Sequence, residues 1–145
     1  MVELMVVVAI VGILALIASP TFTLVQRTRA DLQARSVRSQ LLKARGTARS
    51  TLRCVEVMVS PPRTIATTVY EDCGPPLADA QTPETVTYGD LISFGKWSTG
   101  ETTLVFDSTG GFEADGPVTL EIDSIHEQSW TTTLYPAFGA IRHAQ

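Results

Sequence analysis

Residues 1–18 read MVELMVVVAIVGILALIA, an apolar run in which Glu3 is the single charged side chain. A run of this length and hydrophobicity is close to what spans a bilayer as a helix. An ionised carboxylate inside such a helix is costly unless a cation meets it, so by default it marks a functional site. Because no Lys or Arg lies within the run, the cation has to come from the chain's own processed terminus or from another molecule.

Two simpler interpretations of this run compete with a functional one. A secretory signal peptide needs a basic start, an uncharged apolar segment and a small-residue cleavage site. Here the start is acidic and Ser19-Pro20 places a proline where the cleavable bond would lie, so the sequence disfavours a signal peptide. A plain single-span anchor explains the hydrophobicity equally well, with Glu3 near the interface, and stays open as an alternative.

After Pro20 the chain is predicted to continue as an amphipathic helix to about Arg53. Apolar residues recur there every three or four positions and form one stripe. They are Ala30, Ala34, Val37, Leu41, Ala44, Ala48 and Leu52. At 1.5 Å per residue, about 50 helical residues make a rod of roughly 75 Å. Because a small domain is narrower than this, the first half is expected to protrude and the second half to pack on a head.

Gly12 and Pro20 are predicted to interrupt the apolar half of this helix. Pro20 has no N–H to give the carbonyl of Leu16, and its ring crowds that turn. A kink or local melting is therefore expected between Gly12 and Pro20. In a filament of staggered helices this would allow bending and stretching, and a simple membrane kink is the alternative.

Charge is divided sharply along the chain. Residues 21–53 hold eight basic side chains against one acid, a net charge of +7, whereas residues 54–145 hold three basic side chains against thirteen acids, a net charge of −10. The basic helix suits anionic headgroups or the acidic faces of neighbouring heads, and a solvated helix face is the alternative. The acidic head argues against non-specific nucleic-acid binding, which depends on Lys and Arg at phosphates.

Residues 54–145 are predicted to form a β-rich head. Two β-branched runs, Cys54–Val59 and Thr64–Tyr70, are joined by Ser60-Pro61-Pro62-Arg63 and indicate a hairpin. Further strands are predicted at 91–94, 102–106, 118–122, 130–135 and 138–141, with turns at 107–111 and 115–117 and an exposed loop at 74–83. About 92 residues suffice for one modest core.

The fold class that follows is α+β, with a long N-terminal helix packed on a small antiparallel β-sheet head. Residues 1–27 are predicted to form a membrane or filament-core helix. Residues 28–53 form an amphipathic helix packed on the head, and residues 54–145 form the globular head itself.

Catalytic and metal-binding patterns are absent from the sequence. His126 and His143 have no motif context, and neither a nucleophile elbow nor a phosphate-binding loop occurs. Asp107 and Asp115 flank a glycine-rich turn and could offer oxygen ligands to Ca²⁺, but their spacing fits no recognised Ca²⁺ loop and an ordinary β-turn is favoured. We therefore expect no enzymatic activity, no cofactor and no metal.

The run Val2–Ala15, followed by Ser19-Pro20, resembles the N-terminal segment of type IV pilins and type II secretion pseudopilins, in which Phe-Thr-Leu-(Ile/Val)-Glu-Leu follows the prepilin peptidase cut. The resemblance covers about the first 25 residues. It implies that Glu3 pairs with the methylated N-terminal amine of a neighbouring subunit during filament assembly. Met1 stands at the family's third mature position, so either the start lies further upstream or the chain was trimmed.

A second resemblance is carried by Leu41–Arg49, by VFDSTGGF at 105–112 and by FGAIR at 138–142. These segments are similar to the H-type pseudopilin and FimT/FimU-like minor pilin subfamily, which has a long helix, small antiparallel sheets and a terminal Gly-containing strand. Some members bind DNA through a Gly-Arg-x-Arg terminus. Here Ala140 replaces the first arginine, which leaves Arg142 as the one candidate nucleic-acid contact in that motif, and the acidic head makes nucleic acid an unexpected partner.

Cys54 and Cys73 flank the predicted hairpin. Two cysteines in an exported chain most often form one disulfide, and closing such a loop stabilises by about 3 kcal/mol in the chain-entropy model. Metal binding is disfavoured, because two thiols without nearby His fall short of a tetrahedral zinc set.

The sequence thus predicts a structural subunit of a type IV pilus or pilus-like filament. It would be inserted in the inner membrane with its head in the periplasm, then assembled with identical or homologous pilin subunits by pilus or secretion machinery into a periplasmic or extracellular filament. The alternatives are an H-type pseudopilin of a type II secretion system, a DNA-capturing minor pilin at a pilus tip, and a monomeric membrane-anchored binding domain.

Overall fold

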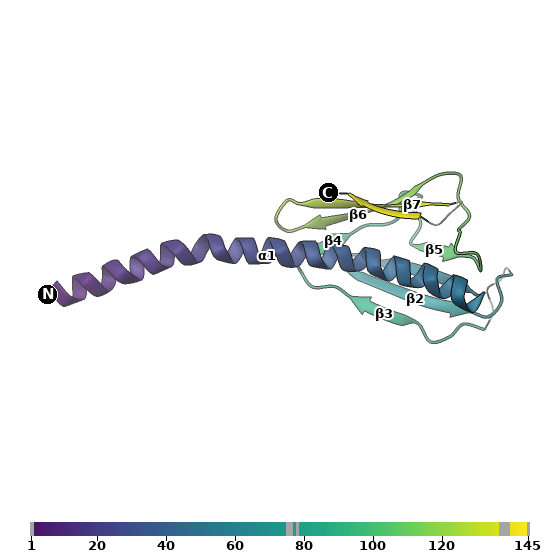
Figure 1. The fold of residues 1–145 in the computed structure, drawn as a ribbon, viewed down its shortest axis with the longest axis horizontal. Coiled ribbons are helices and arrows are strands. Elements are labelled where there is room, and N and C mark those ends of the chain that lie inside the picture. The colour runs from purple at the N-terminus through teal and green to yellow at the C-terminus, as the bar shows by residue number, and fades with distance from the viewer. Residues whose placement is uncertain (1, 75–76, 78, 137–139, 145) are drawn as a thin grey trace.

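The computed structural model describes residues 2–74, 77, 79–136 and 140–144, and for residues 2–3 and 15–21 it describes the backbone only. Within these described residues, one helix, α1 (Val2–Thr51), is followed by eight strands. Figure 1 shows the first half of α1 projecting from the head and its second half lying against two sheets. This arrangement confirms the predicted α+β class with a protruding helix.

The backbone of α1 is helical at every residue from Val2 to Thr51, Gly12 and Pro20 included. The kink or local melting expected between Gly12 and Pro20 stays a prediction. Proline removes one i to i−4 hydrogen bond, yet the helix continues on both sides of Pro20. The projecting half curves smoothly instead of breaking (Figure 1). That Gly12 and Pro20 set this curvature stays a prediction.

The helix ends where Leu52 adopts a left-handed backbone conformation, with φ 54°. The N–H of Arg53 then donates to the carbonyl of Ala48 at 3.2 Å, the closing hydrogen bond of a Schellman cap. Leu52, predicted to extend the apolar stripe, is 75% exposed. The prediction failed there because the left-handed residue turns the chain away from the helix face.

Two four-stranded antiparallel sheets form the head. The first has the order β3-β2-β1-β5, with β1 at Cys54–Ser60, β2 at Thr64–Tyr70, β3 at Glu84–Thr87 and β5 at Thr103–Phe106. The second has the order β4-β6-β7-β8, with β4 at Ile92–Phe94, β6 at Val118–Ser124, β7 at Ser129–Tyr135 and β8 at Ala140–Ala144. The predicted hairpin is confirmed, since β1 pairs with β2 from Cys54↔Tyr70 to Ser60↔Thr64.

Strand β3 escaped prediction, and β8 was placed too early. β3 is four residues long and mostly exposed, so it lacks the apolar alternation from which strands are predicted. The strand predicted at 138–141 lies at 140–144 in the structure, and residues 138 and 139 fall outside the described residues.

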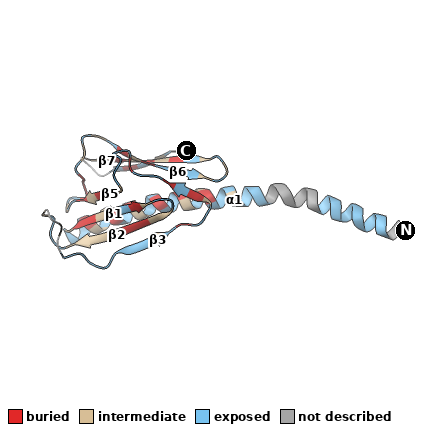
Figure 2. Cartoon of the chain, turned by 180° about the vertical axis from the view of Figure 1, so that it is seen from behind, coloured by how far each residue is buried: buried red, intermediate tan, exposed pale blue. Residues whose placement is uncertain are grey.

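The core lies between the second half of α1 and the inner faces of both sheets (Figure 2). Six residues of the predicted apolar stripe are at most 2% exposed: Ala30, Ala34, Val37, Leu41, Ala44 and Ala48. Four of these six are alanines, so the helix axis can approach the sheets closely. Phe106, Trp97 and Trp130 fill the space opposite them, each at most 2% exposed.

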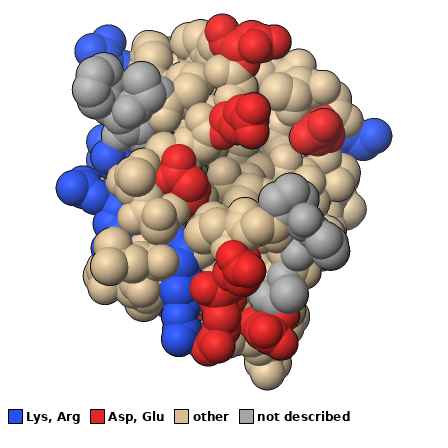
Figure 3. All heavy atoms as spheres, turned by 90° about the vertical axis from the view of Figure 1, so that its right-hand side faces the viewer, with Lys and Arg blue, Asp and Glu red and all other residues tan. Residues whose placement is uncertain are grey.

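Acidic side chains are spread over the end of the head at which α1 terminates (Figure 3). Lys and Arg side chains lie mainly along the left side of this view, with a further basic group at its right edge. We call this end the distal end, and the end from which α1 projects the proximal end.

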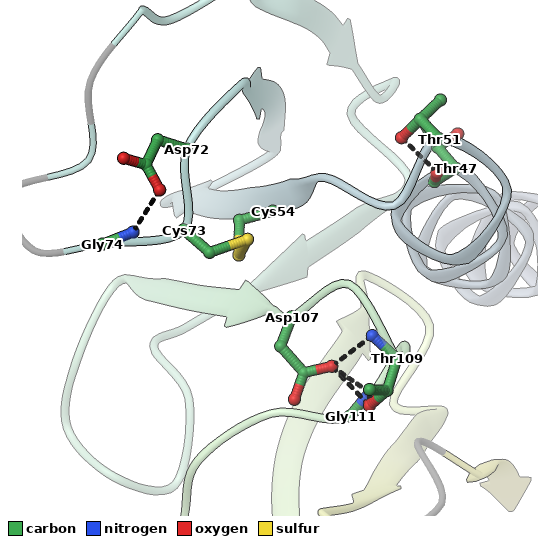
Figure 4. The surroundings of a disulfide bond; sticks show 9 residues. All are labelled: Thr47, Thr51, Cys54, Asp72, Cys73, Gly74, Asp107, Thr109 and Gly111. Carbon is green, nitrogen blue, oxygen red and sulfur yellow. Dashed lines mark hydrogen bonds between the residues drawn. A yellow bond between two sulfur atoms is a disulfide. The ribbon is translucent and has the colours of Figure 1, made fainter.

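The structure contains a disulfide between Cys54 and Cys73 beside the distal end of α1 (Figure 4). Cys54 is buried at the start of β1 and Cys73 is exposed just after β2. The bond therefore fixes the loop after β2 to the strand that directly follows the helix.

We expect Leu41→Ala to lower the free energy of unfolding by about 2–5 kcal/mol, because it leaves a cavity in the seam between helix and sheets. Leu32→Ala is the matched control, since Leu32 is on the same helix but 60% exposed, and it should stay within about 0.5 kcal/mol of wild type. Denaturant unfolding of the detergent-purified chain, followed by the fluorescence of buried Trp97 and Trp130, measures both. Equal losses in the two variants would contradict the packing described.

Replacing both cysteines, as Cys54→Ala with Cys73→Ser, should cost about 3 kcal/mol of stability for a closed loop of this size. The same unfolding measurement checks this, and wild-type protein treated with reductant should lose a similar amount. Non-reducing mass spectrometry of the exported protein should find no free thiol. Two free thiols would contradict the disulfide.

Candidate assembly surface

The projecting half of α1 exposes large apolar side chains along its length. Leu4, Met5, Val7, Val8, Val11, Ile13, Leu14, Phe22 and Leu24 are each between 59% and 75% exposed. Figure 2 shows exposed residues on this half of the helix at 4–14 and again from residue 22 toward the head. Contiguous apolar surface of this extent marks an interaction site, because a helix that is apolar on every side requires a buried environment.

Among the residues whose side chains are described, no helix is long and apolar enough to cross a membrane.

Two of the three predicted assembly residues have backbone positions but no described side chains. Glu3 and Pro20 lie on α1 within the segments where only the backbone is described. At Gly12 an added Cβ would meet no atom within 4 Å. Gly12 therefore leaves a smooth spot on the exposed helix, where a neighbouring backbone can approach closely.

Several basic side chains of α1 find partners within the head. The Lys43 ammonium lies 2.6 Å from a carboxylate oxygen of Glu84, and Arg53 lies 3.0 Å from Glu71. The guanidinium of Arg45 donates to the carbonyl of Gly110 at 3.2 Å. Part of the positive charge of residues 21–53 is therefore paired with negative charge of the same head, and this attraction helps to hold α1 on the head. Surface pairs of this kind contribute little individually.

A hydrogen bond also ties α1 to the head just before its buried stripe begins. Nε2 of His126, in the turn between β6 and β7, lies 2.8 Å from Oε1 of Gln26 and donates to it. This contact lies at the point where the helix leaves the head, so it helps to set the direction of the projecting half.

A groove of about 490 Å³ opens between α1 and the second sheet. It is lined by Asp31, Arg35, Arg38, Ser39, Leu42, Trp130 and His143, and we call it the α1–β8 groove. The Arg38 guanidinium donates to the carbonyl of Ile141 on β8 at 3.5 Å. Arg35 pairs with Asp31 at 2.9 Å, one turn back along the helix.

His143 is held neutral in this groove. Its Nδ1 lies 2.9 Å from the hydroxyl of Thr132, which is fully buried. Burial lowers the pKa of His143, the positive charge of Arg38 lowers it further, Asp31 acts in the opposite direction, and Arg35 adds to the lowering. Desolvation and like charge both disfavour the protonated ring.

The side chain of Asp107 stabilises the turn after β5 by accepting hydrogen bonds. Its Oδ1 accepts from the N–H of Thr109 at 2.7 Å, the hydroxyl of Thr109 at 2.6 Å and the N–H of Gly111 at 3.1 Å (Figure 4). Burial disfavours its ionisation, but these hydrogen bonds outweigh burial and lower the pKa of Asp107. Gly110 has φ +79°, and a Cβ there would lie 2.6 Å from Cγ of Arg49, so the turn requires glycine.

The remaining sequence-predicted residues lie apart from the projecting helix. Arg142 is on β8, with its guanidinium 5.8 Å from the ring centroid of Tyr135. Asp115 lines a shallow hollow with Glu101 and Glu113, and within the described residues no group of three or more His, Cys, Asp or Glu could hold a metal ion.

Sequence reasoning missed the α1–β8 groove. Its lining comes from residues 31–42 of α1, from Trp130 on β7 and from His143 on β8. About a hundred residues separate the two sides, and each side taken alone reads as an ordinary helix face or strand. The pairing of β7 with β8, Thr132 opposite His143, brings them together.

Searches of family models and of curated protein sequences gave no match. Solved structures with this arrangement do exist. The type IV minor pilin FimU of Pseudomonas aeruginosa superposes with a TM-score of 0.63 over 82% of this chain and 90% of its own, at 14% identity. The minor pseudopilin EpsH, from the type 2 secretion system of Vibrio cholerae, gives 0.56 over 80% and 96%, at 17% identity.

These likenesses show a shared fold: a long N-terminal helix packed on antiparallel sheets, as in type IV minor pilins and type II secretion pseudopilins. A second crystal form of FimU gives the same result, with a TM-score of 0.61 over 79% of this chain. This chain has the pilin fold.

The lowered pKa of His143 has a consequence for stability. When a histidine has a lower pKa in the folded chain than in the unfolded chain, the unfolded chain binds the proton first as pH falls. Stability is then complete above about pH 6.5 and declines below it. We expect the melting temperature of wild type to drop more between pH 7.5 and pH 5.5 than that of His143→Gln. Differential scanning calorimetry at both pH values checks this, and identical drops would contradict it.

Proposed function

We propose that this chain is a structural subunit of a type IV pilus or pilus-like filament. It is held first in the inner membrane by the apolar half of α1 and is then polymerised through the same helix with identical or homologous subunits. The observation that supports this best is the exposed apolar half of α1, which continues without a break into a helix anchored in the core of the head.

The apolar half of α1 can be buried both in the membrane before assembly and in the filament after it. In the membrane, lipid covers its side chains, and in a filament the helices of neighbouring subunits cover them instead. Burying a Leu, Val, Ile or Phe side chain fully contributes about 1.5–3 kcal/mol relative to leaving it in water. Large apolar side chains from Leu4 to Val25 therefore make a packed bundle of such helices much more stable than the free subunit in water.

Burial of apolar side chains attracts neighbouring helices to one another but does not fix their relative axial position. Glu3 is proposed to fix that position. A carboxylate within a bundle of apolar helices is costly until a cation neutralises it, so the incoming helix would stop where Glu3 meets the N-terminal amine of a neighbour. Gly12 and Pro20 are proposed to let the helix bend as subunits pack. The fold of the minor pilin FimU and the resemblance of residues 2–15 to pilin N-termini support these roles.

The disulfide supports export of the head. Disulfides persist in the periplasm and outside the cell, and Cys54–Cys73 lies in the head at its distal end. With the projecting helix in the inner membrane, the head would lie on the periplasmic side.

A second candidate is an H-type pseudopilin of a type II secretion system, and the fold shared with EpsH favours it. Deletion separates the two. Loss of surface pili or twitching with secretion intact indicates a pilus, and loss of enzyme secretion with pili intact indicates a pseudopilus.

DNA capture is the weakest candidate. Arg142 is exposed but lies over Tyr135, and residues 54–145 carry a net charge of −10. Few phosphates could be neutralised by such a head, so little counterion release would drive binding.

We expect Glu3→Ala to reach the membrane at wild-type level but to enter filaments at least tenfold less. The reason is that a lost charge-assisted contact of about 1.5–3 kcal/mol amounts to tenfold or more. Immunoblots of membrane and sheared-filament fractions from cells measure both steps.

Two variants control the Glu3 measurement. Glu3→Asp keeps the charge and should retain most incorporation, whereas Glu121→Ala removes an exposed acid of β6 and should have no effect. Normal incorporation of Glu3→Ala would remove Glu3 from the mechanism. Absence of the wild-type chain from every filament would overturn the proposed function itself.

A further inference from the structure

The α1–β8 groove lies at the proximal end of the head. Its helical residues run from Asp31 to Leu42, directly after Ala30, where the buried stripe of α1 begins. Because the helix ends at Thr51, the groove begins at the proximal end of the head, whereas the disulfide loop lies at the distal end.

Two residues that line the groove, Trp130 and His143, have buried ring nitrogens without a hydrogen-bond partner among the described residues. Trp130 is 1% exposed, and its indole Nε1 has no hydrogen-bond partner among the described residues. Nε2 of His143 is likewise buried and without one. A buried donor left unsatisfied is costly, and native proteins satisfy nearly all of them. An indole N–H can only donate, so the missing partner is an acceptor.

The charge of the groove selects an anionic acceptor. Arg35 and Arg38 carry two positive charges, Asp31 carries one negative charge, and His143 is neutral, which leaves the lining net positive. Asp31 already takes the Nε of Arg35 at 2.9 Å. Arg38 is exposed, and its guanidinium donates a 3.5 Å hydrogen bond to the carbonyl of Ile141. A carboxylate beside Arg38 would add a charge-assisted hydrogen bond.

The distal end of the head carries suitable carboxylates. Asp72, beside the disulfide, and Glu113, two residues after the Gly110-Gly111 turn, are both exposed. Figure 3 shows acidic side chains over this end, and Figure 4 places Asp72 and Asp107 near the C-terminal end of α1. The two ends of one molecule are therefore complementary in charge.

A filament of parallel helices brings such ends together. If neighbouring subunits point the same way, the contact between their heads joins different surfaces, the proximal end of one to the distal end of the next, and it repeats without closing. An isologous contact, groove against groove, would place like charges together.

We propose that the α1–β8 groove binds a carboxylate from the distal end of a second copy of this chain, Asp72 or Glu113, with Arg38 and Trp130 as its hydrogen-bond donors. This proposal rests on the proposed function as a filament subunit. It adds a second contact, between the heads of neighbouring subunits, to the one made by the projecting helices. This contact is heterologous, so it fixes the direction in which successive heads point.

Site-specific crosslinking of the full-length chain in cells tests the contact. Ser39 lines the groove and is exposed, so the paired variants Ser39→Cys with Asp72→Cys and Ser39→Cys with Glu113→Cys can be treated with a short bismaleimide. We expect a ladder of dimers and higher multimers from at least one pair. Ser93→Cys with Glu113→Cys is the matched control, since Ser93 is exposed on β4 at the other edge of the second sheet, and it should give no ladder.

Charge reversal tests the chemistry of the contact. Arg38→Glu should reduce the ladder at least tenfold, and Lys96→Glu, the same change at an exposed residue outside the groove, should leave it unchanged. Adding Asp72→Arg or Glu113→Arg, whichever position crosslinks, to Arg38→Glu should restore it. Restoration excludes misfolding as the cause of the loss.

Three results would overturn the proposal: no ladder from either pair, a Ser39→Cys single variant that crosslinks to itself as a dimer, or crosslinks from Ser39→Cys only to a different protein. The filament fraction of the wild-type chain separates this failure from that of the proposed function. Filaments that contain the chain but give no ladder would refute the groove contact alone.

Discussion

The structure depends on the seam between the small-residue stripe of α1 and the inner faces of the two sheets. Ala30, Ala34, Val37, Leu41, Ala44 and Ala48 let the helix lie close to the sheets, where Phe106 on β5, Trp130 on β7 and Trp97 in the loop between β4 and β5 are buried. Since this seam holds only the second half of a 50-residue helix, the first half has to leave the head. The exposure of the apolar side chains on that half therefore follows from how the helix is anchored in the head. An anchored helix also transmits force, because pulling on the projecting half loads the core of the head instead of a flexible linker.

Most of the fold could be predicted because its signals are local. The 3.6-residue spacing of the stripe predicted the helix and its buried face, and β-branched runs on either side of Pro61-Pro62 predicted the first hairpin. Where local signals are weak, prediction failed: β3 is short and exposed, and the left-handed turn at Leu52 depends on capping that the apolar spacing does not reveal. The candidate site likewise has one part that could be predicted from the sequence and one part that could not. The projecting apolar surface is visible in the sequence, but the α1–β8 groove is not, because the register of β7 with β8 and the packing of β8 beside residues 31–42 are tertiary facts.

The placement of charge on α1 connects the local sequence pattern with the tertiary structure. Towards the distal end of α1, Lys43 and Arg53 pair with acids of the head, and Arg45 donates to the Gly110 carbonyl. These contacts answer the question raised by the basic helix, since part of its charge is used within the molecule. Nearer the proximal end, Arg35 and Arg38 line a groove together with Trp130 and His143, whose buried ring nitrogens have no hydrogen-bond partner in the described part of the chain. The basic side chains near the distal end of the helix thus bind groups of the same head, whereas Arg35 and Arg38 line the groove that we propose binds a neighbouring subunit.

This polarity matters for an assembled filament because hydrophobic packing alone does not specify direction or axial position. Apolar helices can slide past one another at small cost, whereas a charge that must meet its partner penalises every other register. A carboxylate near the tip of the helix and a charge-selective groove where the helix enters the head are separated by roughly 40 Å along α1, taking 1.5 Å per residue. Two such points, far apart on one continuous helix, would fix both the axial position and the rotation of a subunit. A contact at either point alone would leave one of these free.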